Sequence, residues 1–513
     1  MPAALAILGT GSDVGKSVIA AGLCRIFARR GRHVAPFKAQ NMSLNSFVTH
    51  EGGEIGRAQA VQALACGLLP SVHMNPILLK PESDTRAQVI VQGRWRHTLE
   101  ASHYGSRQAD LWRAVTDSYQ QVSASCDLVV IEGAGSAAEM NLRDRDLVNW
   151  RMVNHADAKV LLVADIERGG VFAQIVGTLE LLSPEERARI VGIVVNKFRG
   201  DPVLFEDGVR FLEQRTGVPI LGVVPYLFDC RIEPEDGLPE DAHRPVRFTP
   251  HAVNIAVVLL PWMSNVTDFL PLVAEPDVVL RYVRAPCELV DADIVILPGT
   301  KNTLADLAYL QAQQFPAELS AHVRRGRELI GVCGGYQMLG NTLADPEGLE
   351  QGGVATGLGF LDIDTVWRAP KVCRQVEGEV VGLRDLVGMG IVGYQIHCGR
   401  TIAPGGACLR LASRASDPNR FCTPDDGSFE EGAVAPGGRV WGTSVHGLFD
   451  TPEFRRAWLN RARVGKGLEA WPEDASLVVS SALERTVRRW SEHLEQHARL
   501  DVLEQALCRM ESL

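Results

Sequence analysis

A glycine-rich segment near the N-terminus has the sequence of a phosphate-binding loop. Residues 9–17 read GTGSDVGKS and stand between an apolar run at 3–8 and a helical pattern at 16–30. The backbone N–H groups of such a loop, with the N-terminus of the following helix, can surround a phosphate. Thr10 occupies the position of the first glycine of the strict motif, which is a single departure from it. We expect nucleotide binding by Thr10, Gly11, Ser12, Asp13, Gly15, Lys16 and Ser17.

Ser17 and Glu132 are candidate Mg²⁺ ligands. Lys16 would neutralise the terminal phosphates of the nucleotide, and the hydroxyl of the next residue, Ser17, would bind Mg²⁺ beside them. Glu132 ends an apolar run, at the carboxyl end of a predicted strand beside the loop. The next residues, 133–138, also fit the G-x-G-x-x-A pattern of dinucleotide sites. No helical pattern follows them, and no strand ending in an acid follows about 20 residues later, so this alternative is not favoured.

The pair Asn196-Lys197 follows another predicted strand of this half. The Asn196 amide could pair with the edge of a nucleotide base, while the aliphatic stem of Lys197 covers a ring face. The alternative is that Asn196 only ends its strand. Because the pair comes after the phosphate loop in the chain, we expect both residues to bind the nucleotide.

Residues 36–46 are dense in amides and hydroxyls, just after the second predicted strand. Lys38 is placed to stabilise negative charge between the nucleotide and a second substrate. A polar surface loop is the alternative interpretation. The residues of this half that we expect to contact the second substrate are Lys38, Gln40, Asn41 and Asp165.

A cysteine in the second half stands at a predicted strand-to-helix turn. Residues 331–335 read GVCGG, the thiol form of the G-x-S-x-G nucleophile turn. Such a turn exposes the sulfur, and the helix N-terminus favours the thiolate. The Gly334 N–H would donate to an oxyanion, and Gly299, in a loop after its own strand, would supply the second donor. Cys333 is therefore the candidate nucleophile.

A thiol hydrolase needs a general base, and we expect it to be His446. The chain has 13 histidines, and a lone histidine is more often structural. His446 is favoured because it follows a predicted strand late in the domain, after the cysteine turn. Tyr394 and His397 belong to a second polar cluster, which we expect to face the substrate rather than to supply the base.

The composition is that of an ordinary globular protein. A length of 513 residues predicts two or three domains, and the net charge of −10 argues against a nucleic-acid partner. Eleven cysteines without a Cys-x-x-Cys pair argue against a disulfide framework or a zinc ribbon and suit a reducing cytoplasm. No stretch approaches the roughly 20 apolar residues of a membrane span, so no membrane partner is expected. A homo-oligomer is left open.

Alternating strand and helix patterns predict an α/β fold with two doubly wound domains. Short apolar runs in both halves predict buried parallel strands, and an acidic, proline-rich stretch between them predicts a linker. The expected boundaries are a nucleotide-binding domain at 1–232, a linker at 233–250, a second α/β domain at 251–451 and a helical segment at 452–513. We expect the helical segment to pack on the second domain. A dimer contact is the alternative.

Taken in this order, the motifs resemble those of the cobyric acid synthase family, the glutamine-dependent amidases of cobalamin biosynthesis. The first half is similar to the dethiobiotin-synthetase type of P-loop fold, in which Thr10 is the usual residue. The second half resembles class I glutamine amidotransferases, whose triad includes a Glu two residues after the His. Leu448 stands there in this chain, so the sequence assigns no third member. The resemblance covers nearly the whole chain.

The resemblance implies a two-site reaction with L-glutamine, ATP, Mg²⁺ and a corrinoid. Cys333 and His446 would release ammonia from glutamine. The first domain would use ATP to activate the b, d, e and g carboxylates of adenosylcobyrinic acid a,c-diamide, giving adenosylcobyric acid. One alternative function is that of the sister enzyme, which amidates the a and c carboxylates. Segment 40–45 fits the four-amide enzyme better than this sister enzyme. The other is a regulatory P-loop ATPase with a silent amidotransferase module, in which a lysine would replace Gly11.

We predict that Lys16→Ala abolishes amide formation with glutamine and with ammonium alike. Lys16 stands where charge develops on the transferred phosphoryl group, and losing such a contact costs roughly 3–4 kcal/mol of transition-state stabilisation. Amide formation on the corrinoid, measured by mass spectrometry with each nitrogen source, checks this. Retained synthesis with ammonium would show that the loop does not bind the reacting phosphates.

Overall fold

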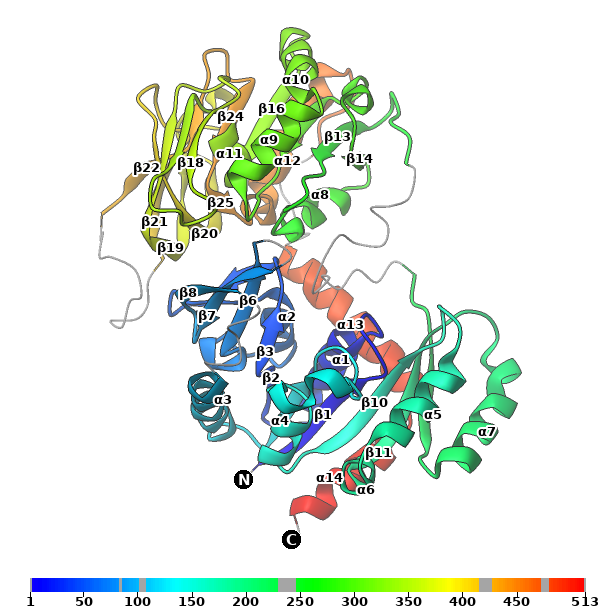
Figure 1. The fold of residues 1–513 in the computed structure, drawn as a ribbon. Coiled ribbons are helices and arrows are strands. Elements are labelled where there is room, and N and C mark those ends of the chain that lie inside the picture. The colour runs from blue at the N-terminus through cyan, green and yellow to red at the C-terminus, as the bar shows by residue number, and fades with distance from the viewer. Residues whose placement is uncertain are drawn as a thin grey trace.

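The chain folds into two α/β halves, each built on a six-stranded sheet (Figure 1). The structure is a computed structural model, and it describes residues 2–82, 85–100, 108–228, 246–414, 427–471 and 479–511. The expected linker at 233–250 lies for the most part outside the described residues. The expected domain boundaries therefore stay predictions.

The sheet of the N-terminal half has the strand order β12-β11-β10-β1-β9-β2, with every pair parallel. These strands are nearly continuous buried apolar runs, as a sheet covered on both faces requires. Their bounds are β1 Ala3–Gly9, β2 Val34–Phe37, β9 Leu128–Glu132, β10 Lys159–Asp165, β11 Ile190–Phe198 and β12 Ile220–Pro225. The carboxyl ends of all six strands therefore meet at one edge of the sheet.

Helices cover both faces of this sheet. One face packs against α1 (Lys16–Arg29) and part of α2 (Arg57–Ala65). The other face packs against α3 Gln108–Ser123, α4 Trp150–His155, α5 Val171–Leu181 and α7 Glu206–Thr216, with the short α6 Pro184–Ala188 beside β11. This half is thus doubly wound, as the alternating pattern predicted.

Two small sheets extend from this half toward the other, where the sequence indicated only a polar loop. One is the mixed sheet β3-β6-β7-β8, and the other is the hairpin β4-β5. Figure 1 shows β6, β7 and β8 directly below the second half. Their bounds are β3 Gln40–Met42, β4 Ser46–Val48, β5 Glu54–Gly56, β6 Ile77–Pro81, β7 Arg86–Val91 and β8 Arg94–Glu100.

The central sheet of the C-terminal half has the order β14-β13-β15-β16-β24-β23, parallel except for β23. Its strands are β13 Val253–Val258, β14 Val278–Val283, β15 Ile294–Leu297, β16 Glu328–Val332, β23 Ala433–Val434 and β24 Val440–Thr443. Helices α8 Leu270–Val273, α9 Thr303–Ala312, α10 Phe315–Arg324, α11 Gly334–Met338 and α12 Pro452–Gly465 accompany it. This arrangement agrees with the second predicted α/β domain.

A seven-stranded, mainly antiparallel sheet adds to this half, which the strand pattern did not reveal. Its main path is β18-β17-β19-β20-β25, and off this path β21 pairs with β19 and β22 pairs with β21. The strands are β17 Thr342–Asp345, β18 Gly353–Thr356, β19 Asp364–Val380, β20 Gly390–Ile402, β21 Leu409–Ser413, β22 Phe429–Glu431 and β25 Val445–His446. Because β20 pairs with β25, the polar cluster at 394–399 lies beside His446.

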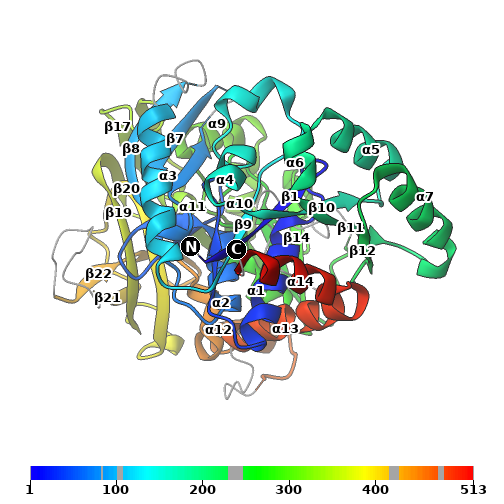
Figure 2. The same ribbon diagram turned by 90° about the horizontal axis from the view of Figure 1, so that it is seen from below.

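The last two helices pack on the N-terminal half, so the expectation that they cover the second domain was wrong. Helix α13 (Val479–His497) lies along α1, and α14 (Leu500–Glu511) contacts β1. Figure 2 shows both of these helices, in red, beside the blue α1. Trp490 donates from Nε1 to the Val18 carbonyl at 2.5 Å, and a Cβ on Gly22 would lie 2.9 Å from that ring nitrogen. The glycine lets the two helices approach each other.

No helix in the described ranges is both long and apolar enough to span a bilayer.

We predict that Trp490→Ala lowers the free energy of unfolding of the N-terminal half by about 3–5 kcal/mol. Trp490 is buried between α13 and α1, and alanine leaves a cavity and removes the hydrogen bond to the Val18 carbonyl. Urea denaturation, monitored through the loss of nucleotide binding, measures this change in the free energy of unfolding. The matched control is Leu204→Ala, because Leu204 is 84% exposed on the same half. Equal midpoints for the two variants would contradict this packing.

Candidate active sites

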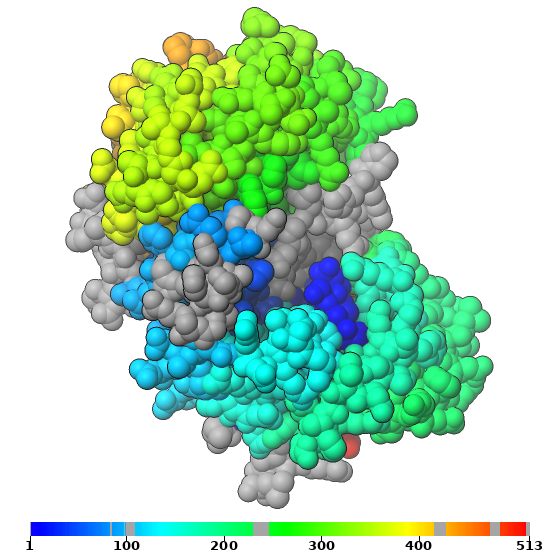
Figure 3. Space-filling view, in the orientation of Figure 1, coloured from blue at the N-terminus to red at the C-terminus, as the bar shows by residue number. Residues whose placement is uncertain are grey.

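The phosphate loop connects β1 to α1 at the carboxyl edge of the first sheet. Gly15 has a φ of +99°, and a Cβ there would lie 2.2 Å from the Asn196 side chain, so only glycine fits. Lys16 turns back over the loop, and its Nζ donates to the carbonyls of Gly11 and Gly135, both at 2.9 Å. The space-filling view shows the dark blue N-terminal residues beside a hollow in this face (Figure 3). The loop thus has the strand–loop–helix geometry that a phosphate site needs, and phosphate binding stays a prediction.

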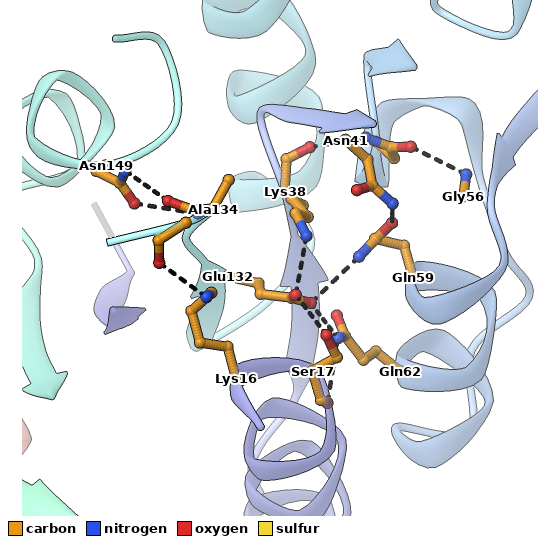
Figure 4. Close-up of polar contacts among 12 residues, drawn as sticks. Lys16, Ser17, Lys38, Asn41, Gly56, Gln59, Gln62, Glu132, Ala134 and Asn149 are labelled. Carbon is orange, nitrogen blue, oxygen red and sulfur yellow. Dashed lines mark hydrogen bonds and ion pairs between the residues drawn. The ribbon is translucent and has the colours of Figure 1, made fainter. Parts of the chain in front are cut away.

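The Glu132 carboxylate is fully buried beside the loop and accepts four side-chain hydrogen bonds (Figure 4). The Ser17 hydroxyl donates at 2.7 Å and the Lys38 ammonium at 2.9 Å, both to Oε1. The amides of Gln62 and Gln59 donate to Oε2 at 2.5 and 3.2 Å. Burial alone would raise the pKa of Glu132, but the charge of Lys38 and these hydrogen bonds lower it overall. Glu132 is therefore an ionised carboxylate.

The donor set at Ser17 and Glu132 suits Mg²⁺. Both groups are hard oxygen ligands, and the hydroxyl and the carboxylate already meet at 2.7 Å next to the phosphate loop. Lys38 lies at the same carboxylate oxygen, so a cation and an ammonium group would share one negative charge. The residues present fit the metal, and its binding stays a prediction.

Asn41 belongs to the same polar network, whereas Asp165 does not. The Asn41 amide donates to the Gln59 side chain at 3.0 Å, which links β3 to the Glu132 site. Asp165 ends β10, which is separated from β2 and Lys38 by β1 and β9. Its carboxylate instead faces the Lys197 ammonium at 3.3 Å. The four residues expected to bind the second substrate are thus divided between two places along the sheet edge, with the half-buried Gln40 on the Asn41 side.

Asn196 contacts the phosphate loop directly. Its amide donates to the Val14 carbonyl at 3.0 Å, and its side chain is almost fully buried. Asn196 therefore has a position that supports the loop backbone, which sequence reasoning did not anticipate. Its expected contact with a nucleotide base stays a prediction, as does that of Lys197.

Cys333 lies in a strained turn between β16 and α11, as the GVCGG pattern predicted. Its backbone has a φ of +50°, a region that L-residues with side chains rarely adopt. The turn is tight because a Cβ on Gly335 would lie 2.0 Å from the Leu297 carbonyl oxygen. Strain of this kind persists only where surrounding packing enforces it, and it occurs often at active sites. The Cys333 sulfur lies 3.8 Å from the Ile396 carbonyl.

Two backbone segments that could hold an oxyanion meet at Cys333. A Cβ on Gly299 would lie 2.9 Å from the His446 ring and 3.7 Å from the Cys333 Cβ. A Cβ on Gly334 would lie 3.2 Å from the Thr300 nitrogen. The first amides of a helix have no partner within it, so the Gly334 N–H can donate to a ligand. The Thr300 N–H, in the same 298–301 loop that the sequence indicated, is a further candidate donor, while the Thr300 hydroxyl donates to Asp306.

Asp268 is the carboxylate partner of His446 that sequence reasoning could not assign. Its Oδ2 lies 2.7 Å from His446 Nδ1, and its Oδ1 accepts from the Gly447 N–H at 2.9 Å. Burial alone would lower the pKa of His446, but the interactions with Asp268 and Cys333 raise it to about 10. Asp268 precedes His446 by 178 residues, in the turn Val266–Phe269, so no local motif could reveal it.

Tyr394 and His397 both lie at this site. The Tyr394 ring is stacked on the His446 ring at 5.5 Å between centroids. His397 Nδ1 lies 2.7 Å from the Gly399 carbonyl, and burial lowers the pKa of His397 to about 4, so its ring is neutral. His397 lines the cavity at Cys333, as expected for a substrate-facing residue, and Tyr394 instead supports His446.

The cavity at Cys333 has walls from both halves of the chain. Besides Cys333 and His446 it is lined by Lys301 and Lys371 of the C-terminal half and by Lys80 and Gln88 of the N-terminal half. Lys80 and Gln88 are directly opposite on β6 and β7, so their side chains share one face of that sheet. The glutaminase-type cavity is therefore closed by the nucleotide-binding half.

A P-loop with a buried carboxylate and a cysteine–histidine–aspartate site together define the class of glutamine-dependent, amide-forming enzymes. Residues 5–240 match the CobQ/CobB/MinD/ParA nucleotide binding domain, and residues 254–454 match the CobB/CobQ-like glutamine amidotransferase domain. The chain is 45% identical over 509 residues to cobyric acid synthase of Salmonella dublin, covering 98% of this chain and 97% of the relative. It is 47% identical over 478 residues to that of Sorangium cellulosum, with coverage of 90% and 91%. This chain belongs to the cobyric acid synthase family.

We predict that Asp268→Asn lowers the kcat of glutamine hydrolysis about a hundredfold, within the range for lost acid–base catalysis. Asparagine would donate to His446 Nδ1 and force the tautomer that cannot accept the cysteine proton. The lost charge also lowers the pKa of His446 from about 10, so the alkaline limb of the pH–rate profile moves to lower pH. Glutamate release across pH measures both effects. Asp362→Asn, at the surface, is the control, and an unshifted limb in Asp268→Asn would contradict the assignment.

Proposed function

We propose that this chain amidates the b, d, e and g carboxylates of adenosylcobyrinic acid a,c-diamide, using ATP and L-glutamine, to give adenosylcobyric acid. The observation that carries the proposal is the juxtaposition of the Cys333–His446–Asp268 site with the nucleotide-binding half, whose Lys80 and Gln88 line the same cavity. The full-length similarity to cobyric acid synthases supports the choice of substrate.

Glutamine hydrolysis would proceed through a thioester on Cys333. Because its pKa is raised to about 10, His446 already holds the cysteine proton. The Cys333 thiolate attacks the carboxamide carbon, and the His446 imidazolium gives its proton to the departing ammonia. The N–H groups of Gly334 and the 299–300 loop would donate to the oxyanion as it forms. Water, deprotonated by His446, cleaves the thioester and releases glutamate. Asp268 holds the imidazole in the tautomer and orientation that these transfers need.

Amide formation would follow activation of the corrinoid carboxylate by phosphorylation in the first half. A carboxylate oxygen takes the terminal phosphoryl group, ADP leaves, and ammonia then attacks the acyl carbon with loss of phosphate and a proton. Lys16 and Lys38 would stabilise the charge on the transferred group. Mg²⁺, held by Ser17 and Glu132, would add positive charge beside the phosphates.

The sister reaction on the a and c carboxylates is the nearest alternative substrate assignment. Both reactions need the same two sites, so the geometry at Cys333 and Glu132 does not separate them. Incubation with each corrinoid acid, followed by counting the amides by mass, distinguishes the two. Four added amides on the a,c-diamide support the proposal, and amidation only of the a and c groups would overturn it.

We predict that Cys333→Ala and His446→Ala lose amide formation with glutamine but keep it with ammonium. Both residues serve only the release of ammonia, and both lie in the half without the phosphate loop. The rescue grows as pH rises, because NH₃ rather than NH₄⁺ is the nucleophile. The matched control is Cys408→Ala, which removes another buried thiol of the same half and should keep both activities. A folded Cys333→Ala that is inactive with ammonium would show that the two steps are not divided in this way.

A further inference from the structure

Two residues of the nucleotide-binding half contact the turn that carries Asp268. The Asn45 side-chain oxygen accepts a hydrogen bond from the Val266 N–H at 3.2 Å. The Ser46 N–H donates to the Asn265 side-chain oxygen at 3.1 Å. Asn45, Ser46 and Asn265 are each no more than 2% exposed. These are direct, buried hydrogen bonds between the two halves.

The same turn sets the position of the Asp268 carboxylate. Asn265 has a φ of +53°, and its carbonyl accepts from the Asp268 N–H at 3.0 Å. Only Thr267 stands between Val266 and Asp268 in the chain. A shift of Asn265 and Val266 therefore also moves Asp268. Without the acceptor on Asn45, the buried Val266 N–H would have to find another partner or shift toward water.

Ser46 also contacts the other residue that supports His446. Its carbonyl accepts from the Tyr394 hydroxyl at 3.3 Å, and the Tyr394 ring is stacked on His446. His446 is thus held on one side by Asp268 and on another by Tyr394. Tyr394 is hydrogen-bonded directly to Ser46. Asp268 is connected to Asn45 and Ser46 through the other residues of its turn.

The Asn45-Ser46 step is in turn connected to the nucleotide site. The Asn45 carbonyl accepts from the N–H of Arg57, the first residue of α2, at 3.1 Å. Helix α2 carries Gln59 and Gln62, whose amides bind the Glu132 carboxylate. The position of Asn45 therefore depends on the helix that also contacts the proposed phosphate and metal site.

We propose that Asn45 and Ser46 are positioning residues for the glutaminase site, holding the Asp268–His446 pair so that glutamine hydrolysis depends on the nucleotide-binding half. This inference rests on the proposed function. It adds that the two half-reactions are coupled by contact between the halves, in addition to any transfer of ammonia.

The test is Asn45→Ala in the full chain, with glutamate release and ammonium-supported amide formation measured separately. We expect the kcat for glutamate release to fall about tenfold, the effect of one unsatisfied buried donor, and the KM for glutamine to change less than about twofold. Ammonium-supported amide formation should stay within about twofold of wild type, because it does not use His446. Equal losses in both activities, or no loss in either, would overturn the proposal.

The pH profile gives a readout that a loss of folded protein would not move. The charged or titratable groups that face His446 are Asp268 from its turn, Cys333 from the elbow, and Tyr394 and His397 from β20, while Asp450 lies beside Gly447. All of them remain in Asn45→Ala. If Asp268 moves away from His446, the alkaline limb of glutamate release shifts to lower pH. An unshifted limb together with an unchanged kcat would show that Asn45 does not position the pair.

Two further variants separate positioning from stability. Asn265→Gly removes the hydrogen bond between Asn265 and Ser46 by changing the residue of the C-terminal half, and glycine keeps the left-handed backbone. It should therefore reproduce the fall in the kcat of glutamate release. Asn254→Ala removes a buried amide with three hydrogen bonds to residues of its own half, and should keep the kcat and the limb. Wild-type enzyme that neither releases glutamate nor amidates the corrinoid would instead reject the proposed function. That outcome is distinguishable from the failure of Asn45→Ala alone.

Discussion

The buried carboxylate of Glu132 is the constraint on which the nucleotide-binding half depends. A carboxylate without solvent exposure is very unfavourable unless it is paired and hydrogen-bonded. Its donors come from three separate elements: Ser17 from α1, Lys38 from the end of β2, and Gln59 and Gln62 from α2. Satisfying one charge therefore fixes the phosphate loop, the second strand and α2 relative to one another.

That arrangement extends to the other half because β3 to β5 lie between Lys38 and α2 in the chain. Glu54, on β5, pairs with Lys80 at 2.7 Å and with Lys371 of the C-terminal half at 2.5 Å. Burial would raise the pKa of Glu54, but the two lysine charges lower it well below its usual range. Burial also lowers the pKa of Lys80, to about 8. Removing one member of such a buried group costs about 3–5 kcal/mol, so these pairs enforce a single register between the halves.

Lys301 extends this polar interface to the oxyanion loop. It pairs with Glu82 of the N-terminal half at 3.0 Å and directly follows Thr300. The loop, the Asp268 turn and Tyr394 thus each have a partner in the nucleotide-binding half. The glutaminase site is built on its own sheet, but its surroundings are shared between both halves.

The sequence by itself determined the parts whose chemistry is local. The phosphate loop, the Cys333 turn and the strand before His446 are short segments in which glycine positions and neighbouring apolar runs dictate the backbone, so nine or fewer residues suffice to recognise each. Tertiary structure alone decided the pairs that lie far apart in the chain. Asp268 meets His446, Asn45 meets Val266, and α13 lies on α1 rather than on the second sheet. An isolated aspartate or an amphipathic helix is compatible with many partners, and only the packing of the complete chain selects one of them.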